Sequence, residues 1–118
     1  MIEQIVQTYL SEHLSVPVLM ELPEVPSAGY PSMPERFIVL EKVGGGMADQ
    51  IEAGSIAVQS YSLNSLYEAA QLDEQVRAVM WGIIELDDIS EVRISSNYNH
   101  TDTRTKRYRY QSVFDFHY

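Results

Sequence analysis

The segment from Leu63 to Leu86 repeats apolar side chains at helical spacing, and it constrains the fold more than any other part of the chain. Ser65 and Glu68 stand at the spacing of a capping box, which marks the start of a helix. A helix over this segment is roughly 30 Å long, so it spans the width of a small domain. Its apolar stripe consists of Leu66, Ala69, Leu72, Val76, Val79 and Ile83, widened by Ala70 and Met80.

Strand-like sequence flanks the predicted helix on both sides. Residues 36–43 and 51–61 form a predicted β-hairpin with a long connecting turn. The run Phe37–Leu40 is continuously apolar, which indicates a strand that is covered on both faces. Beyond the helix, residues 91–99 and 106–118 alternate between apolar and polar side chains, which predicts two further strands.

The alternation assigns the side chains of these last two strands to faces. In residues 91–99 it places Val92, Ile94 and Tyr98 together on one face. In residues 106–118 it directs five aromatic residues towards the core, namely Tyr108, Tyr110, Phe114, Phe116 and Tyr118. The opposite face of that strand carries polar residues, namely Arg107, Arg109, Gln111, Asp115 and His117.

The first third of the chain supplies one more helix and one more strand. Residues 2–14 have helical spacing, and residues 16–21 predict a short strand near Pro17. Four prolines make residues 22–34 a loop. The resulting order α-β-β-β-α-β-β predicts one domain over residues 1–118. Its class is α+β, with a mostly antiparallel sheet and both helices packed on one face.

Composition excludes several classes of function. The chain has no cysteine, which excludes disulfides, thiolate metal sites and a cysteine nucleophile. Its net charge of −9 argues against broad affinity for nucleic acid, because that affinity comes from neutralising phosphates. No segment has the roughly 20 apolar residues that span a bilayer, and the acidic N-terminus does not have the pattern of a signal peptide. We therefore expect a soluble protein made in the cytoplasm, with no membrane partner.

A glycine run, Gly44-Gly45-Gly46, follows the first strand of the predicted hairpin. It lacks the Lys-Ser/Thr ending of a phosphate loop, and no helix pattern begins directly after it. We interpret the run as the flexible tip of the hairpin. Together with Met47 it is a candidate segment for ordering on a partner.

The three histidines do not form a recognisable metal site. His13 lies on the apolar stripe of the first helix, where a partly buried structural role is expected. His117 stands two residues after Asp115 and His100 two residues before Asp102, but neither pair has a third ligand fixed by spacing. We therefore predict no metal ion, no cofactor and no catalytic residue, and thus no enzyme.

Half of the chain's eight Lys and Arg residues lie close together, namely Arg104, Lys106, Arg107 and Arg109. Basic residues interleaved with tyrosines are typical of some nucleic-acid-binding strands. The neighbouring tyrosines are predicted to face the core, however, and are then not available to stack on bases. The favoured interpretation is that this basic strip contacts an acidic protein surface, such as a neighbouring subunit.

Four stretches of the chain resemble a known family: VPVLMELPEVP, PERFIVLEKVGGG, IEAGSIAVQSYSLNSLYEAAQLDEQV and ISEVRISSNYNHTDTRTKRYRYQSVFDFHY. The most specific parts are IAVQSYS-x3-LYEAA and SNYN-x-TD-x3-KRYRYQ-x-VFD. The family consists of small phage and prophage proteins from Gram-positive hosts. They are encoded among the head–tail joining genes and are described as tail terminator, tail completion or minor tail proteins. The similarity covers nearly the whole chain.

The resemblance implies an α+β subunit that assembles, typically as a hexameric ring, on the end of a phage tail tube. Such a ring ends tube polymerisation and docks to the head–tail connector protein. From the negative net charge we further expect that DNA passes through the lumen without specific binding. The implied locations are the virion tail and, during assembly, the host cytoplasm. The family has no known catalytic residues.

The proline-rich loop, the glycine tip and the turn at residues 100–106 are the predicted docking segments. The interface candidates are Arg104, Lys106, Arg107, Arg109, Gly44, Gly45, Gly46 and Met47, together with Tyr30 in the proline-rich loop. Two alternatives stay open at this point. One is a head–tail adaptor or minor tail subunit of the same fold, and the other is a nucleic-acid-binding module that uses the basic strip.

Overall fold

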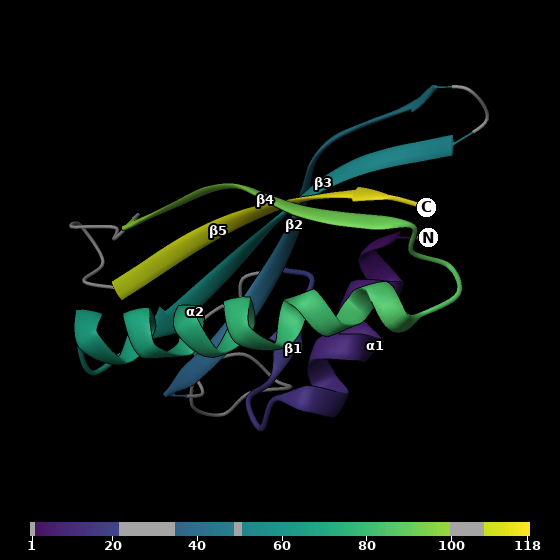
Figure 1. Ribbon diagram of the computed structural model, residues 1–118. Coiled ribbons are helices and arrows are strands. Elements are labelled where there is room, and N and C mark those ends of the chain that lie inside the picture. The colour runs from purple at the N-terminus through teal and green to yellow at the C-terminus, as the bar shows by residue number, and fades with distance from the viewer. Residues whose placement is uncertain (1, 22–34, 49–50, 100–107) are drawn as a thin grey trace.

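The computed structural model describes residues 2–21, 35–48, 51–99 and 108–118 (Figure 1). Its elements follow one another as α1 (Ile2–His13), β1 (Val18–Leu19), β2 (Arg36–Ala48), β3 (Ile51–Ser62), α2 (Leu66–Met80), the 3-10 helix η1 (Trp81–Glu85), β4 (Glu91–Asn99) and β5 (Tyr108–His117). This order confirms the predicted succession and the α+β class, and it adds η1. The predicted loop at 22–34 and the turn at 100–106 lie outside the described residues, and so do Tyr30, His100, Asp102, Arg104, Lys106 and Arg107.

The strands form a five-stranded sheet in the order β1-β2-β3-β5-β4. β1 runs parallel to β2, and the other neighbouring strands are antiparallel. Both helices lie on the same side of the sheet, which gives the predicted two layers (Figure 1). We call the sheet face towards the helices the inner face and the opposite face the outer face.

Two apolar clusters cover the two faces of the sheet. The main core lies between the helices and the inner face, and it includes Ile38 and Leu40 of β2. A smaller cluster on the outer face consists of Phe37, Val39 and Tyr61, with Leu19 packed against it. All four residues of the run Phe37–Leu40 are buried, so the prediction of a strand covered on both faces is confirmed. The helices and the remaining strands contribute to the main core chiefly Val6, Leu10, Ile56, Val58, Leu72, Val76, Phe114 and Phe116.

The first helix matches its predicted range, but its histidine does not have the predicted role. The His13 side chain is exposed rather than partly buried. It stacks on the Tyr9 ring, with the ring centroids 4.1 Å apart. His13 is the last residue of α1, three residues beyond the last buried position of the helix, Leu10.

The strand that follows α1 is shorter than the predicted range 16–21. Only Val18 and Leu19 pair with β2, opposite Ile38 and Val39. Pro17 has no N–H to donate, and it contributes only its carbonyl, which accepts from the Ile38 N–H at 2.9 Å. Among the described residues, the sheet therefore has only a two-residue strand beside β2 at this edge.

α2 begins where the capping box predicts. The Ser65 hydroxyl accepts a hydrogen bond from the Glu68 N–H at 3.1 Å, which satisfies one of the donors that a first turn leaves unpaired. Leu66 was predicted to lie on the apolar stripe, but it is the first residue of α2 and its side chain is exposed. The rest of the stripe is confirmed as buried or half-buried, namely Ala69, Ala70, Leu72, Val76, Val79, Met80 and Ile83.

The α-helix ends at Met80 and not near Leu86 as predicted, and a 3-10 helix takes over. The close approach of α1 explains the change. The Tyr9 hydroxyl donates to the Val79 carbonyl at 2.5 Å, and a continuing α-helix would pair that carbonyl with the N–H four residues later. A Cβ atom at Gly82 would lie 2.5 Å from the Tyr9 oxygen, so a larger residue at this position would displace the Tyr9 hydroxyl. Burial, and after it the charge of nearby Glu85, raises the pKa of Tyr9.

The glycine run lies within a strand, so its prediction as the hairpin tip is wrong. Gly44, Gly45 and Gly46 belong to β2 and pair with residues 53–55 of β3. The register shifts at Val43, where a β-bulge interrupts the ladder. The strand continues through the glycines because β3 supplies partners for them, and this pairing overrides their low strand propensity. The ends of β2 and β3 extend beyond the rest of the sheet (Figure 1).

A second bulge changes the predicted faces of β4. Val92 and Ile94 lie on the inner face as predicted, packed against the main core. The register then shifts between Ile94 and Ser96, which reverses the direction of the later side chains. Tyr98 therefore points to the outer face, where its hydroxyl accepts a hydrogen bond from Gln111 at 2.7 Å, and its predicted placement with Val92 is wrong.

The alternation predicted for the last strand is confirmed in β5. Phe114 and Phe116 are buried in the main core on the inner face, and Tyr118 packs against it. Arg109 and Gln111 point the other way and contact outer-face residues. This strand therefore carries the polar side chains from which the candidate site is built.

Candidate functional site

The predicted interface residues do not lie together in the structure. The glycine run lies in the part of β2 that pairs with residues 53–55, whereas Arg109 aligns with Tyr61 at the other end of β3. Strands advance about 3.3 Å per residue, so these two groups are roughly 20 Å apart along the sheet. The structure therefore separates the glycine run from Arg109. The other predicted basic residues, and Tyr30, lie outside the described residues.

Arg109 is held on the outer face by an aromatic pair. Its guanidinium donates to the Tyr61 hydroxyl at 2.8 Å, and the guanidinium carbon lies 5.6 Å from the centre of the Tyr61 ring. Tyr61 in turn stacks on Phe37, with the ring centroids 4.8 Å apart and an interplanar angle of 7°. The hydrogen bond and the cation–π contact fix the position of the charge on this face.

Next to Arg109, a row of polar side chains crosses four strands on the outer face. The Gln59 amide donates to Glu41 at 3.3 Å and to the Gln111 carbonyl oxygen at 3.1 Å. Gln111 donates in turn to the Tyr98 hydroxyl. Both glutamines are buried, with 8% of their surface exposed. The row therefore satisfies amides that would be unfavourable in an unpaired state.

A groove of about 610 Å³ opens beside this row, along the edge of β2. Its walls include Leu40 and Lys42, which point to the inner side, as well as Val39 and Glu41, which point to the outer side. Because residues of both faces of β2 line it, the groove must run along the edge of that strand. The other lining residues are Glu3, Met20, Glu21, Gln59, Tyr61 and Arg109.

The groove combines an apolar floor with charged walls. Glu3, Glu21 and Glu41 supply three carboxylates, and Lys42 and Arg109 supply two cations. The Lys42 ammonium lies 3.9 Å from a Glu3 oxygen. Such a surface can bind a polypeptide segment through its backbone and through charged side chains.

A second charged cluster lies where the start of β4 and the end of β5 lie beside the start of β3. Glu91 accepts from Arg93 at 2.5 Å and lies 2.8 Å from His117 Nδ1. Ser55 donates to Asp115 at 2.5 Å. These side chains surround a hollow of about 260 Å³. The Arg93 hydrogen bond, followed by that of His117, lowers the pKa of Glu91, and the same contact with Glu91 raises the pKa of Arg93.

The predicted pair Asp115/His117 thus belongs to this cluster, although the two residues have different partners. Neither this cluster nor any other within the described ranges brings three or more His, Asp or Glu side chains into a position to hold a metal ion. In the same parts of the chain, no helix is both long enough and apolar enough to cross a membrane. The arrangement supports ion pairing between strands.

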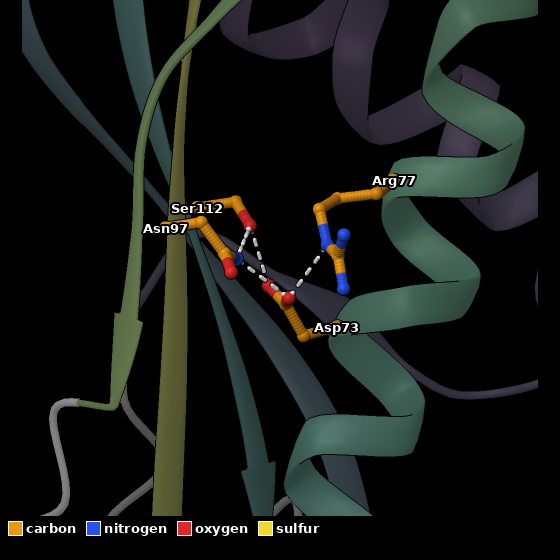
Figure 2. Close-up of polar contacts among 4 residues, drawn as sticks. All are labelled: Asp73, Arg77, Asn97 and Ser112. Carbon is orange, nitrogen blue, oxygen red and sulfur yellow. Dashed lines mark hydrogen bonds and ion pairs between the residues drawn. The ribbon is translucent and has the colours of Figure 1, made fainter.

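A third polar network lies on the inner face and was not predicted. The Asp73 carboxylate of α2 is completely buried. It accepts hydrogen bonds from Arg77 at 3.0 Å, from Asn97 at 2.7 Å and from Ser112 at 2.5 Å (Figure 2). Asn97 also donates to the Ser112 hydroxyl at 2.7 Å. The network joins α2 to β4 and β5, and its donors satisfy the buried charge.

Sequence reasoning could have found part of these networks. Asp73 stands at helical spacing from Ala69 and Val76, inside the apolar stripe, which is an unusual place for a carboxylate. Gln59 and Gln111 interrupt otherwise apolar or aromatic strands. What the sequence does not contain is the pairing of strands that brings these residues together.

A scan against protein-family models finds no match for this chain, and a search of curated proteins finds none either. The resemblance to phage tail proteins therefore remains a prediction.

Proposed function

We propose that the protein is a structural subunit of a phage or prophage tail that assembles with itself into a ring and caps the tail tube. The observation that carries this proposal is the groove along the β2 edge, where a strand edge, an apolar floor and charged side chains occur together. Surfaces of this kind suit contact with another chain, because an open edge can accept a further strand. The resemblance of the sequence to tail terminator proteins supports the same function.

Ring assembly requires two different surfaces on each subunit that fit each other head to tail. The two edges of this sheet are dissimilar. One has the short β1 and the groove, and the other is β4 with its bulge. A subunit with dissimilar edges can bind one neighbour on each side in the same orientation, and such contacts form a ring when the rotation between neighbours closes on itself. The tail tube and the head–tail connector would then contact the two remaining sides of the ring.

The charge of the chain also fits a ring through which DNA passes. With a net charge of −9, the protein repels the phosphate backbone more than it attracts it. A lumen of this character lets DNA pass without binding it. In this arrangement the basic strip contacts protein and not DNA.

Tail tube assembly in vitro tests the proposed function. Tube protein from the same phage or prophage is polymerised with and without this protein, and tube lengths are measured by negative-stain microscopy. We expect elongation to stop at a small fraction of the tube-protein concentration, because one ring suffices for each tube end, and we expect rings at those ends. Tubes that grow to the same length without a bound ring would falsify the proposal.

Two other outcomes would assign the alternatives. Binding to the head connector with no effect on tube length would favour a head–tail adaptor. Binding to DNA that weakens steeply with salt would favour a nucleic-acid-binding module. The latter binding should also disappear when four residues are changed together, namely Arg104, Lys106, Arg107 and Arg109.

A further inference from the structure

The groove along the β2 edge also points to the part of a second subunit that it binds. We propose that it receives the basic segment Arg104–Arg107 of a second copy of this chain, extended and paired with the edge of β2. This inference rests on the proposed self-assembly and identifies the contact between subunits.

The first argument is the open strand edge. β1 pairs with β2 only at Ile38 and Val39. From Leu40 onward, no strand within the described ranges pairs with this side of β2. The outward N–H and C=O groups there can accept an added strand. With a volume of about 610 Å³, the adjoining groove has room for a few side chains of an extended segment but not for a folded domain.

The second argument is the charge of the groove. Its three carboxylates outnumber its two cations. One oxygen of Glu3 is buried and receives no hydrogen bond from the described residues. Lys42 lies 3.9 Å from it, which is within range for an ion pair but too far for a hydrogen bond. A buried carboxylate oxygen without a donor is unfavourable, so the groove favours an occupant that brings cationic donors.

The third argument is the composition of the chain. Three of its eight Lys and Arg residues, Arg104, Lys106 and Arg107, fall within four consecutive positions. Thr103 and Thr105 alternate with them and are β-branched, which favours an extended conformation. When such a segment is added to a strand edge, Arg104 and Lys106 point to one side of the sheet and Arg107 to the other. The segment can therefore bring cations both to Glu41 on the outer side of β2 and to Glu3 on the inner side.

The fourth argument is that a chain cannot place its own segment there. The segment lies between Asn99 and Tyr108, and Tyr108 aligns through β3 with Arg36 at the start of β2. From this row to Leu40 is about 13 Å along β2, and the position of an added strand is about 14 Å across from β5, which makes a separation of about 19 Å. Four extended residues place Arg104 at most about 14 Å from Tyr108. Pairing with the groove edge therefore requires a second copy.

Disulfide cross-linking tests this contact directly, because the native chain has no cysteine. Two full-length variants, Glu41→Cys in the groove and Lys106→Cys in the basic segment, are mixed under mild oxidation, both free and on capped tail tubes. We expect a disulfide-linked heterodimer of the two variants. As a control, Gln75→Cys places a cysteine on the exposed side of α2, and its mixture with Lys106→Cys should give no heterodimer above background.

Charge exchange provides a second, independent measurement. We expect groove reversal (Glu3→Lys with Glu41→Lys) to weaken self-association by at least about tenfold, because charge-assisted contacts are lost. Segment reversal (Arg104→Glu, Lys106→Glu and Arg107→Glu) should weaken it to a similar extent. A mixture of the two reversed proteins should associate again, because each supplies the charge that the other needs. Circular dichroism would confirm that both remain folded.

The results also separate this contact from the proposed function. If no heterodimer forms, free or on tubes, or if both reversed variants still assemble and cap tubes, the contact is wrong and the tail function stands. If the heterodimer forms but the native protein does not cap tubes, the contact stands and the tail function is wrong.

Discussion

On the inner face of the sheet a charge is buried, the Asp73 carboxylate, beside neutral serine hydroxyls, whereas on the outer face the buried polar groups are the neutral amides of Gln59 and Gln111. Asp73 receives its hydrogen bonds from a helix and two strands (Figure 2). The glutamines bond mainly to each other and to side chains of the same sheet. The inner network therefore joins two layers, while the outer network joins neighbouring strands of one layer.

This difference has a consequence for what each face can do. A buried carboxylate is costly to desolvate, so it is compatible with the fold only while all its donors stay in place. Such a group favours one position of α2 on the sheet over others. A row of neutral amides near the groove can exchange one partner for another at lower cost. The inner face is thus suited to holding the fold, and the outer face to meeting a partner.

The largest expected effect comes from removing the inner charge. In Asp73→Ala, the Arg77 guanidinium and the Asn97 and Ser112 donors lose their common acceptor. We expect the free energy of unfolding to fall by about 3–5 kcal/mol, measured by denaturant titration. The matched control is Glu74→Ala, which removes the same charge from an exposed neighbouring position on α2 and should change stability by less than about 0.5 kcal/mol. Equal effects of the two variants would contradict the assigned role of Asp73.

The next prediction tests the close contact between α1 and η1. Gly82→Ala adds a methyl group only 2.5 Å from the oxygen of the Tyr9 hydroxyl, so one of the two groups must move. We expect a loss of about 1–3 kcal/mol from the resulting displacement. Removing the hydroxyl with Tyr9→Phe should relieve the clash, so that Gly82→Ala costs clearly less in that background. A double-mutant cycle that shows strict additivity would argue against the contact.

The fold class could be predicted from the sequence because its strongest signals are local. The helical stripe of α2, the apolar run Phe37–Leu40 and the alternation of β5 each follow from the period of one element. The wrong predictions for the glycine run and for Tyr98 involve β-bulges, at Val43 and Ser95. A bulge adds one residue on one strand only, and the partner strand decides where it falls. Alternation within a single strand cannot locate it.

The candidate site was less predictable, because it depends on long-range pairing. Asp73 and its partners Asn97 and Ser112 are 24 and 39 residues apart. The outward direction of Arg109 followed from alternation, and this prediction is confirmed. The groove beside it exists because β1 stops after two residues. The apolar pattern of residues 16–21 predicts a longer strand there, so the sequence does not indicate the stretch of β2 edge that the described residues leave unpaired.

The third prediction compares the inner carboxylate with one on the outer face. Asp115 accepts a hydrogen bond from Ser55 and is half-buried, so water can replace the lost contact. We expect Asp115→Ala to lower the free energy of unfolding by about 1 kcal/mol, well below the effect of Asp73→Ala. Ser55→Ala should cost a similar amount, since it removes the other partner of the same hydrogen bond. A loss for Asp115→Ala as large as that for Asp73→Ala would remove the distinction between the two faces.

The smallest effect concerns Glu91 and appears as a dependence on pH. Arg93, and after it His117, holds the pKa of Glu91 below its usual range in the folded protein, so the unfolded chain binds the proton more tightly. The resulting stability is present above the ordinary glutamate pKa of about 4.3 and is lost as the pH falls through the lowered value. Glu91→Gln should therefore lose less stability than the native protein between about pH 5 and pH 3. Salt should reduce this difference, because the group is partly exposed. Glu74→Gln is the matched control, and an acid response of Glu91→Gln identical to that of the native protein would show that the contacts of Glu91 with Arg93 and His117 do not stabilise the fold.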